Sequence, residues 1–139
     1  MAPVVDITSK AQFDELVKTT PYVALQAHAS WCGPCKAISP FFNKHSDAFG
    51  NDKFTFARFD TDDVSDLAME LGIRSIPAFF FFENGEKTEN LTGANPTALQ
   101  KLAATFGEKA KGEKTKGNKD LRFADAGFFE KQLSTNEDF

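Results

Sequence analysis

The only two cysteines of the chain, Cys32 and Cys35, are separated by Gly33 and Pro34 in the segment HASWCGPCKAISP (28–40). Two thiols at this spacing could bind a metal ion, close a structural disulfide or work as a redox pair. These three interpretations make different demands on the rest of the sequence, so the residues around the pair can be used to choose among them.

A metal site is the weakest of the three interpretations. Zinc usually takes four protein ligands in a structural site, and the only His and Cys candidates are the two thiols, His28 and His45. His28 falls on a predicted strand, whereas His45 lies about three helical turns beyond the cysteines. Because these four groups are not expected to meet at one ion, we expect no metal and no cofactor.

A structural disulfide is also disfavoured. Small domains built on disulfides are secreted and usually carry four or more cysteines. The first residues, MAPVVDITSK, lack a basic region followed by an apolar run, and no window approaches the roughly 18 apolar residues of a membrane span. We therefore expect a cytoplasmic or nuclear protein with no membrane partner, in which the thiols serve redox chemistry.

The residues around Cys32 favour a reactive thiol. Only a thiolate attacks a disulfide, so Cys32 must lose its proton near neutral pH. If Pro34 and Cys35 begin a helix, the Cys32 sulfur lies at the positive end of the helix dipole, which stabilises its anion. Cys35 is expected to be more buried and to resolve the mixed disulfide. Trp31 would supply an apolar rim, and Gly33 would leave room for a partner backbone.

Length and charge fit one acidic domain with an appendage. The chain has 139 residues, a net charge of −4, 41% hydrophobic residues and 26% charged residues, which suits a single folded domain over residues 1–107. Residues 108–120 are rich in Lys and Gly and are expected to form a flexible linker, because they have no large apolar side chain to bury. Five lysines and three acids there make only a weak basic patch, so we expect no nucleic-acid partner.

Residues 121–139 form a Phe-rich tail, in which a short helix could place Phe123, Phe128, Phe129 and Leu133 on one side. A helix this short is marginal alone, so any order would have to come from docking. The tail could be disordered, dock on its own domain or join a second copy. The protein is accordingly expected to be a monomer or a tail-mediated dimer.

The first 107 residues alternate between strand and helix patterns. Apolar runs predict strands at 4–7, 22–27, 54–59 and 78–82. Capping residues and helical spacing predict helices beginning after Ser9, after the cysteines with Pro40 as a kink, over 63–72, and after Asn95. Asn84-Gly85 predicts a hairpin into a polar strand around 87–91. This order predicts an α/β fold with a mixed central sheet between helices.

The WCGPCK motif, the strand before it, SIP (75–77), FFENGE (81–86) and the late Gly93 together resemble thioredoxin. The resemblance covers about residues 3–107 in order and spacing. It implies the thioredoxin fold, a mixed five-stranded sheet flanked by four helices, with a cis Ile76–Pro77 peptide facing the cysteines. It also implies disulfide-containing proteins and a thioredoxin reductase as partners. The implied substrate-binding residues are Trp31, Gly33, Pro34, Ile76, Pro77 and Gly93.

Gln26 and Arg58 depart from the family pattern. Where this chain has Gln26, thioredoxins usually carry a buried aspartate, which is thought to take the proton of the second cysteine. Where it has Arg58, they often carry a lysine. Because glutamine cannot exchange a proton, we expect slower turnover or another acceptor. His28 shares a strand face with Gln26 and could be that acceptor, or it could simply pack and hydrogen-bond the backbone. Arg58 is expected to turn to solvent or to Asp60.

Taken together, these patterns predict a thiol-disulfide oxidoreductase that reduces protein disulfides, with Cys32 as nucleophile and Cys35 as resolving thiol. The competing hypothesis is an interaction module of the same fold, with weak or no turnover and a partner-binding Phe-rich tail, because a fold does not guarantee an activity.

Overall fold

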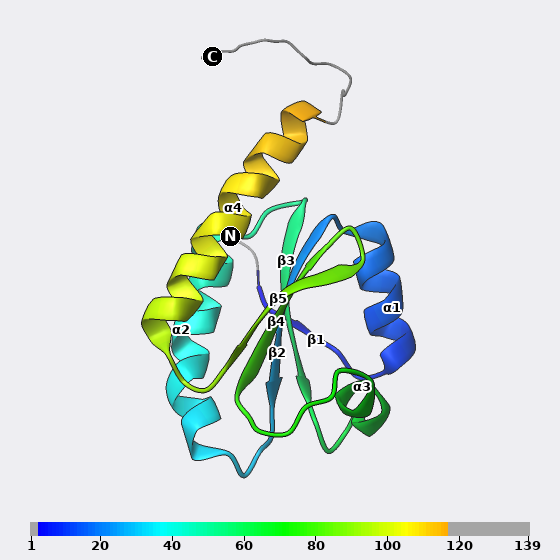
Figure 1. Cartoon of the computed structure of the whole chain (residues 1–139), viewed down its shortest axis with the longest axis vertical. Helices are drawn as coiled ribbons and strands as arrows, with labels where there is room; N and C mark the ends of the chain where they lie inside the picture. Colours follow the sequence, from blue (N-terminus) through cyan, green and yellow to red (C-terminus); the bar gives the residue numbers. More distant parts are fainter. Residues whose placement is uncertain (1–2, 117–139) are drawn as a thin grey trace. The chain divides into compact units, whose positions relative to one another are not determined.

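The computed structural model describes residues 3–116 of the chain, which divides after Gly107 into two units, the first of which holds the sheet. Figure 1 shows helices on both sides of a central sheet. The elements are β1 (Val5–Asp6), α1 (Lys10–Thr19), β2 (Tyr22–His28), α2 (Gly33–Phe49), β3 (Phe54–Asp60), α3 (Ser65–Glu70), β4 (Ala78–Glu83), β5 (Glu86–Thr92) and α4 (Pro96–Lys116).

The sheet has the strand order β1-β3-β2-β4-β5. Strands β1, β2 and β3 are parallel, whereas β4 runs antiparallel to β2 and β5 antiparallel to β4. The predicted mixed five-stranded sheet is therefore confirmed. Because β2 is the central strand, the cysteine motif that follows its last residue, His28, begins at the middle of the sheet.

One face of the sheet is covered by α1 and α3 (Figure 1). Alternation along β2 sends Val23, Leu25 and Ala27 to this face, where all three are fully buried. Phe13 of α1 meets Phe82 of β4 edge to face, with ring centroids 5.2 Å apart. The buried hydrophobic cluster on this side consists of Ile7, Phe13, Val23, Leu25, Ala27, Ala57, Phe59, Val64, Leu67, Ala78, Phe80 and Phe82.

The opposite face is covered by α2 and by the first part of α4 (Figure 1). Phe42 of α2 packs against Phe56 and Phe79, with ring centroids 5.2 and 5.6 Å apart. Phe106 of α4 lies 5.0 Å from Phe81 by the same measure. The phenylalanine run 79–82 is thus core on both faces, as a strand covered on both sides requires.

Local signals in the sequence mark where several elements begin and turn. The Ser9 hydroxyl accepts the N–H of Gln12 at 3.1 Å, and Asn95 Oδ1 accepts the N–H of Ala98 at 3.1 Å, so both residues cap helices. Asn84 (φ 53°) and Gly85 (φ 87°) adopt the positive φ values that a tight hairpin turn needs. The sequence identified all three signals correctly.

The structure differs from the sequence prediction after Gly107. Helix α4 continues through Lys116, so residues 108–116 are helical where a flexible linker was expected. Ala, Lys and Glu are good helix formers, and extending an existing helix avoids the cost of nucleation. A Glu108–Lys111 ion pair of 3.7 Å accompanies the extension. The Phe-rich tail at 121–139 lies outside the described residues, and the domain boundaries stay predictions.

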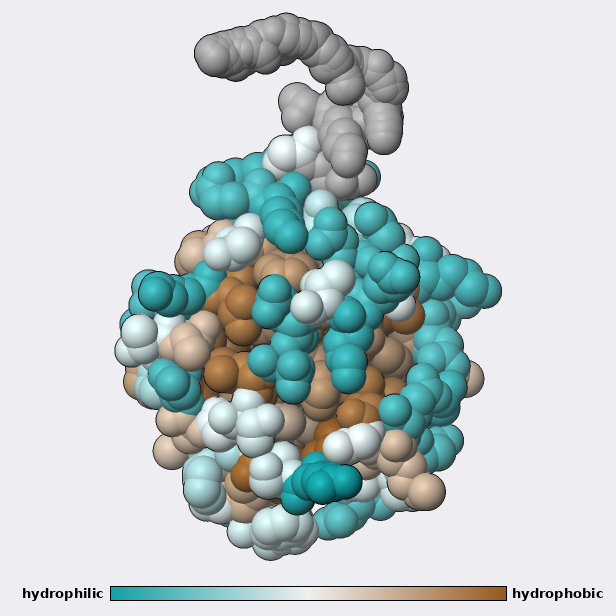
Figure 2. Space-filling view, viewed as in Figure 1, coloured by the Kyte–Doolittle hydropathy of each residue, from teal (hydrophilic) through white to brown (hydrophobic). Residues whose placement is uncertain are grey.

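Strand β5 is an edge of the sheet, and its side chains are almost all exposed. Its sequence, EKTENLT, places charged and polar groups along this edge, which discourages pairing with a second sheet. Figure 2 shows polar side chains bordering a band of hydrophobic residues on the side of the molecule in view.

Of the helices that the structure describes, none combines the length and apolar character that crossing a membrane requires.

Candidate active site

Cys32 is the N-cap of α2, and its sulfur lies at the start of the helix. Its backbone is extended, and its Sγ accepts the N–H of Cys35 at 3.1 Å. Pro34 occupies the first turn, where a missing N–H costs nothing because that group would have no intrahelical partner. The sulfur is therefore held at the positive end of a 17-residue helix, as the sequence predicted.

Cys32 and Cys35 form a disulfide, with Cα atoms 5.3 Å apart. The structure thus represents the oxidised protein. Cys32 is 3% exposed and Cys35 2%, so burial hardly distinguishes them. The expectation that Cys35 would be the more buried thiol is therefore not decided by exposure; Ala29 and the partly buried Ile76 pack in one cluster with both cysteines. Position relative to the helix end is what separates the two cysteines.

Trp31 forms the rim of the site, with 68% of its surface exposed. Its indole Nε1 donates to Asp62 Oδ2 at 2.9 Å, so the ring is held by the loop after β3. Beside it lies a groove of about 400 Å³, lined by Trp31, Thr61, Ala68, Ile73, Arg74, Ser75 and Ile76. An exposed aromatic ring next to a shallow groove can hold an apolar segment of another protein.

The Ile76–Pro77 peptide is cis, as the resemblance implied. Ile76 packs against the cysteine cluster, so the loop before β4 does face the disulfide. The Pro77 carbonyl accepts the N–H of Gly93 at 2.8 Å, and Gly93 has a φ of 101° that strongly favours glycine. Gly93 is therefore connected to the loop that faces the disulfide by its hydrogen bond to Pro77, which is itself buried.

Gln26 is completely buried on the α2 face of the sheet. Its Nε2 donates to Ser39 Oγ at 3.1 Å, and Ser39 Oγ donates to the Cys35 carbonyl at 2.8 Å. Its Oε1 is buried without a hydrogen-bond partner among the residues that the structure describes. Two hydrogen bonds thus connect this glutamine with the second cysteine.

His28, the last residue of β2, is half-buried. Burial lowers its pKa below the usual value, whereas the nearby Asp60 carboxylate acts in the opposite direction. The two residues are cross-strand neighbours in the β2–β3 register. The His28 carbonyl also accepts the N–H of Thr61 at 2.8 Å. A largely neutral imidazole at neutral pH is able to accept a proton.

Arg58 corrects a detail of the sequence prediction. It turns neither to solvent alone nor to Asp60: its Nε donates to Asp6 Oδ1 at 2.6 Å. The two residues are register partners in β1 and β3, so their side chains share a face of the sheet. The Asp6 side chain is 67% exposed, so the guanidinium is paired where water can reach it.

His45 lies in α2, and its Nε2 is buried without a hydrogen-bond partner among the described residues. Burial lowers its pKa below the usual value, and the nearby Lys44 adds to this shift. Across residues 3–116, no group of three or more His, Cys, Asp or Glu side chains is arranged to hold a metal ion. The prediction that the protein needs no metal stays a prediction.

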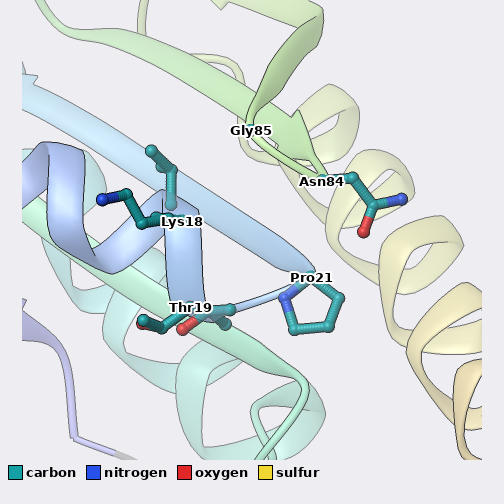
Figure 3. A pocket seen from close by; sticks show the side chains of 7 residues that line it. Lys18, Thr19, Pro21, Asn84 and Gly85 are labelled. Carbon is teal, nitrogen blue, oxygen red and sulfur yellow. The ribbon is translucent and has the colours of Figure 1, made fainter.

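A second hollow, of about 440 Å³, lies between the end of α1 and the β4–β5 turn (Figure 3). Pro21 in its wall precedes the first residue of β2, whereas the cysteines follow the last, so this hollow is at the opposite end of the strand. The side chains of Lys18 and Asn84 extend in opposite directions (Figure 3). Without convergent polar groups, its size alone does not indicate chemistry.

Sequence reasoning missed three polar partners: Ser39 for Gln26, Asp62 for Trp31 and Asp6 for Arg58. Ser39 follows Cys35 by four residues, so helical spacing alone places it one turn above that cysteine. No comparable sequence signal joins Trp31 to Asp62 or Arg58 to Asp6, because these contacts connect segments 31 and 52 residues apart. The predicted roles of all site residues stay predictions.

Comparison with known proteins identifies the family. A family model described as thioredoxin matches residues 4–105. The chain is 40% identical over 96 residues to a thioredoxin of Coprinus comatus, covering 69% of this chain and 91% of that one. It is also 40% identical over 109 residues to thioredoxin-like protein 1 of Schizosaccharomyces pombe. That alignment covers 78% of this chain but only 38% of that longer protein.

The fold agrees with solved structures as well. The crystal structure of Malassezia sympodialis thioredoxin superimposes with a TM-score of 0.73 at 39% identity, covering 77% of this chain and 93% of that one. The predicted fold is confirmed, and a disulfide-bonded Cys32–Cys35 pair supports thiol-disulfide exchange as its chemistry. The chain therefore belongs to the thioredoxin family, a family of thiol-disulfide oxidoreductases.

Proposed function

We propose that this chain reduces disulfide bonds in proteins, with Cys32 as the nucleophile and Cys35 as the resolving thiol. The observation that carries the proposal is the Cys32 sulfur at the N-terminus of α2, where it accepts the N–H of Cys35 at 3.1 Å. The same N–H would hydrogen-bond the Cys32 thiolate of the reduced protein. Together with the helix dipole, this contact lowers the energy of the anion that attacks a disulfide.

The reaction cycle is balanced by the two cysteines alone. The Cys32 thiolate attacks one sulfur of the substrate disulfide, forms a mixed disulfide and releases the other substrate sulfur as a thiolate. The Cys35 sulfur, after losing its proton, then attacks Cys32 and releases the second substrate thiolate. Two electrons pass to the substrate, and the protein is left with the Cys32–Cys35 disulfide present in the structure.

The substrate face would be formed by Trp31, Gly33, Pro34 and the loop at Ile76–Pro77. A Cβ added at Gly33 would meet no atom within 4 Å beyond its chain neighbours and the backbone of its own helix. Packing therefore does not require glycine there, which supports the prediction that the bare backbone leaves room for a partner. Gly93 would act indirectly, because its hydrogen bond to Pro77 fixes the loop that faces the cysteines.

The proton of Cys35 needs an acceptor during resolution, and Gln26 cannot provide one. We propose His28 as a candidate, since burial keeps its pKa low and its imidazole neutral. The alternative is that His28 only packs at the end of β2 and that water takes the proton. Replacing His28 with Phe distinguishes these roles, because only a proton acceptor lowers the resolution rate near pH 7 when removed.

The thioredoxin family acts on disulfide-containing proteins and is regenerated by thioredoxin reductase, which makes the same partners the best candidates here. We place the protein in the cytoplasm or nucleus and expect no nucleic-acid partner. Whether it is a monomer or a tail-mediated dimer depends on residues 121–139, which lie outside the described part of the chain.

Reduction of a model protein disulfide, such as those of insulin, tests the proposal. The reduced wild type should accelerate the reaction, Cys32→Ser should abolish the acceleration, and Cys35→Ser should accumulate mixed disulfides with the substrate. Equal rates for wild type and Cys32→Ser would favour the competing hypothesis, an interaction module whose Phe-rich tail binds a partner.

A further inference from the structure

The buried Gln26 side chain has an acceptor that the oxidised protein leaves unused. Its Oε1 is inaccessible and has no hydrogen-bond partner among residues 3–116. A buried acceptor that no protein donor reaches is unfavourable unless another group supplies the hydrogen bond. Such an atom in a functional protein suggests a partner that is present in another state.

Ser39 fixes which end of the Gln26 amide is left without a partner. The serine hydroxyl has one hydrogen, and it donates that hydrogen to the Cys35 carbonyl at 2.8 Å. Toward Gln26 the hydroxyl can therefore only accept, so the NH₂ end of the amide must face it, at 3.1 Å. The unused oxygen is thus the other end of an amide whose NH₂ group is connected through Ser39 to the Cys35 carbonyl.

Reduction creates one new buried donor in this place. Cys35 is 2% exposed and cannot donate while its sulfur is in the disulfide. When the disulfide takes up two electrons and Cys35 takes up a proton, a thiol S–H appears on the residue to which Ser39 connects Gln26. Cys35 is almost completely buried in the oxidised protein, and the amide oxygen has no donor among the described residues.

We propose that Gln26 Oε1 accepts the hydrogen bond of the Cys35 thiol in the reduced protein, and that Ser39 is the residue that positions it. The contact favours the dithiol over the disulfide and keeps the proton on Cys35 until resolution. The amide takes no proton itself. This inference rests on the proposed redox function but concerns the reduced state, which can be examined without any substrate.

The S–H stretching band of Cys35 tests the contact directly. In the Cys32→Ser protein, Cys35 is the single thiol and cannot form the internal disulfide. Its infrared S–H band should lie at the lower frequency of a hydrogen-bonded thiol. Gln26→Met in the same background keeps the length of the side chain but removes the acceptor, and it should move the band to higher frequency. An unmoved band overturns the proposal.

Three further variants separate positioning from packing. Ser39→Ala should move the band toward that of Gln26→Met, because the amide loses its anchor, whereas Ser39→Thr should keep the wild-type band by retaining the hydroxyl. Gln100→Met makes the same chemical change at an exposed position of α4 and should leave the band unchanged. A band that is the same in Ser39→Ala and Ser39→Thr overturns the positioning role.

The thiol-disulfide equilibrium gives a second reading in the protein with both cysteines. Gln26→Met should shift the equilibrium with glutathione toward the disulfide by about five- to tenfold, the size of one buried hydrogen bond. A change under about twofold, or a shift toward the dithiol, contradicts the proposal. Neither measurement uses a substrate. The protein can therefore fail to reduce insulin while this inference stands, or reduce insulin while this inference fails.

Discussion

The two faces of the sheet are built from different chemistry. The face under α1 and α3 buries a large apolar cluster, and the buried polar residues of the described chain, Gln26, His45 and Ser46, are not part of it. The face under α2 buries phenylalanines at one end and Gln26 near the cysteines, where the partly buried Ser39 contacts it. Among the described residues, the two buried side-chain atoms without a partner, Gln26 Oε1 and His45 Nε2, belong to residues on this side. The first face supplies stability, whereas the second accepts unfavourable polar burial where the redox chemistry takes place.

The largest effect on stability should come from the apolar face. Leu25 is fully buried there, and Leu25→Ala should lower the free energy of unfolding by about 2–5 kcal/mol through lost burial and a cavity. Urea denaturation measures this loss. Met69→Ala, at a residue 81% exposed, is the matched control and should cost less than about 0.5 kcal/mol. The rate per folded molecule should not change, and a selective loss of activity would contradict the division between the faces.

Gln26→Asp, on the face covered by α2, should lower stability but change the reaction rate as well. A carboxylate in a fully buried site is costly, so we expect a loss of about 1–3 kcal/mol in the free energy of unfolding with the fold retained. The carboxylate also restores a proton acceptor near Cys35, so resolution of a mixed disulfide should become about tenfold faster. Stopped-flow fluorescence of Trp31 would follow resolution. An unchanged rate would show that proton transfer to residue 26 does not limit resolution.

Acid should destabilise the protein through its two histidines, His28 and His45. The folded-state pKa values of His28 and His45 are lowered by burial, so the unfolded chain binds more protons in mildly acidic solution. Their contribution is fully present above about pH 6.5 and is lost as the pH falls through the folded pKa values.

The double variant His28→Phe/His45→Leu should therefore lose less stability than the wild type between pH 7 and pH 5, in denaturation curves at each pH. The acid-labile Asp and Glu residues are shared by both proteins and cancel in the comparison. Parallel stability profiles would mean that the histidines do not carry this part of the acid sensitivity.

The smallest effect is expected at Asp6 of the edge strand β1, whose carboxylate pairs with Arg58. Because both side chains are at least a third exposed, Asp6→Asn should cost only about 0.2–1 kcal/mol, and the cost should shrink in high salt. Thermal melts at low and high salt measure it. A cost of several kcal/mol would show that the arginine needs this partner as a buried charge would.

Much of the fold could be predicted from local signals. Ser9 and Asn95 as helix caps, Asn84-Gly85 as a turn, and the apolar runs as strands all depend on neighbours in sequence, and all were found correctly. The linker prediction failed over 108–116 because composition alone does not show that a preceding helix can be extended. The position of Cys32 at a helix start was likewise a local inference from Pro34 and the following spacing.

The sequence by itself determined the redox pair, its position on a helix N-terminus and the alternation that closes one apolar face, because these follow from spacing within a few residues. Only the tertiary structure decided which distant groups meet: Asp62 with Trp31, Asp6 with Arg58, and Gln26 with Ser39. Partner choice for a buried polar group depends on which donors and acceptors the packed elements bring within about 3 Å. Packing alone therefore showed that Gln26 Oε1 has no partner among the described residues, on a side chain that Ser39 connects to the Cys35 carbonyl.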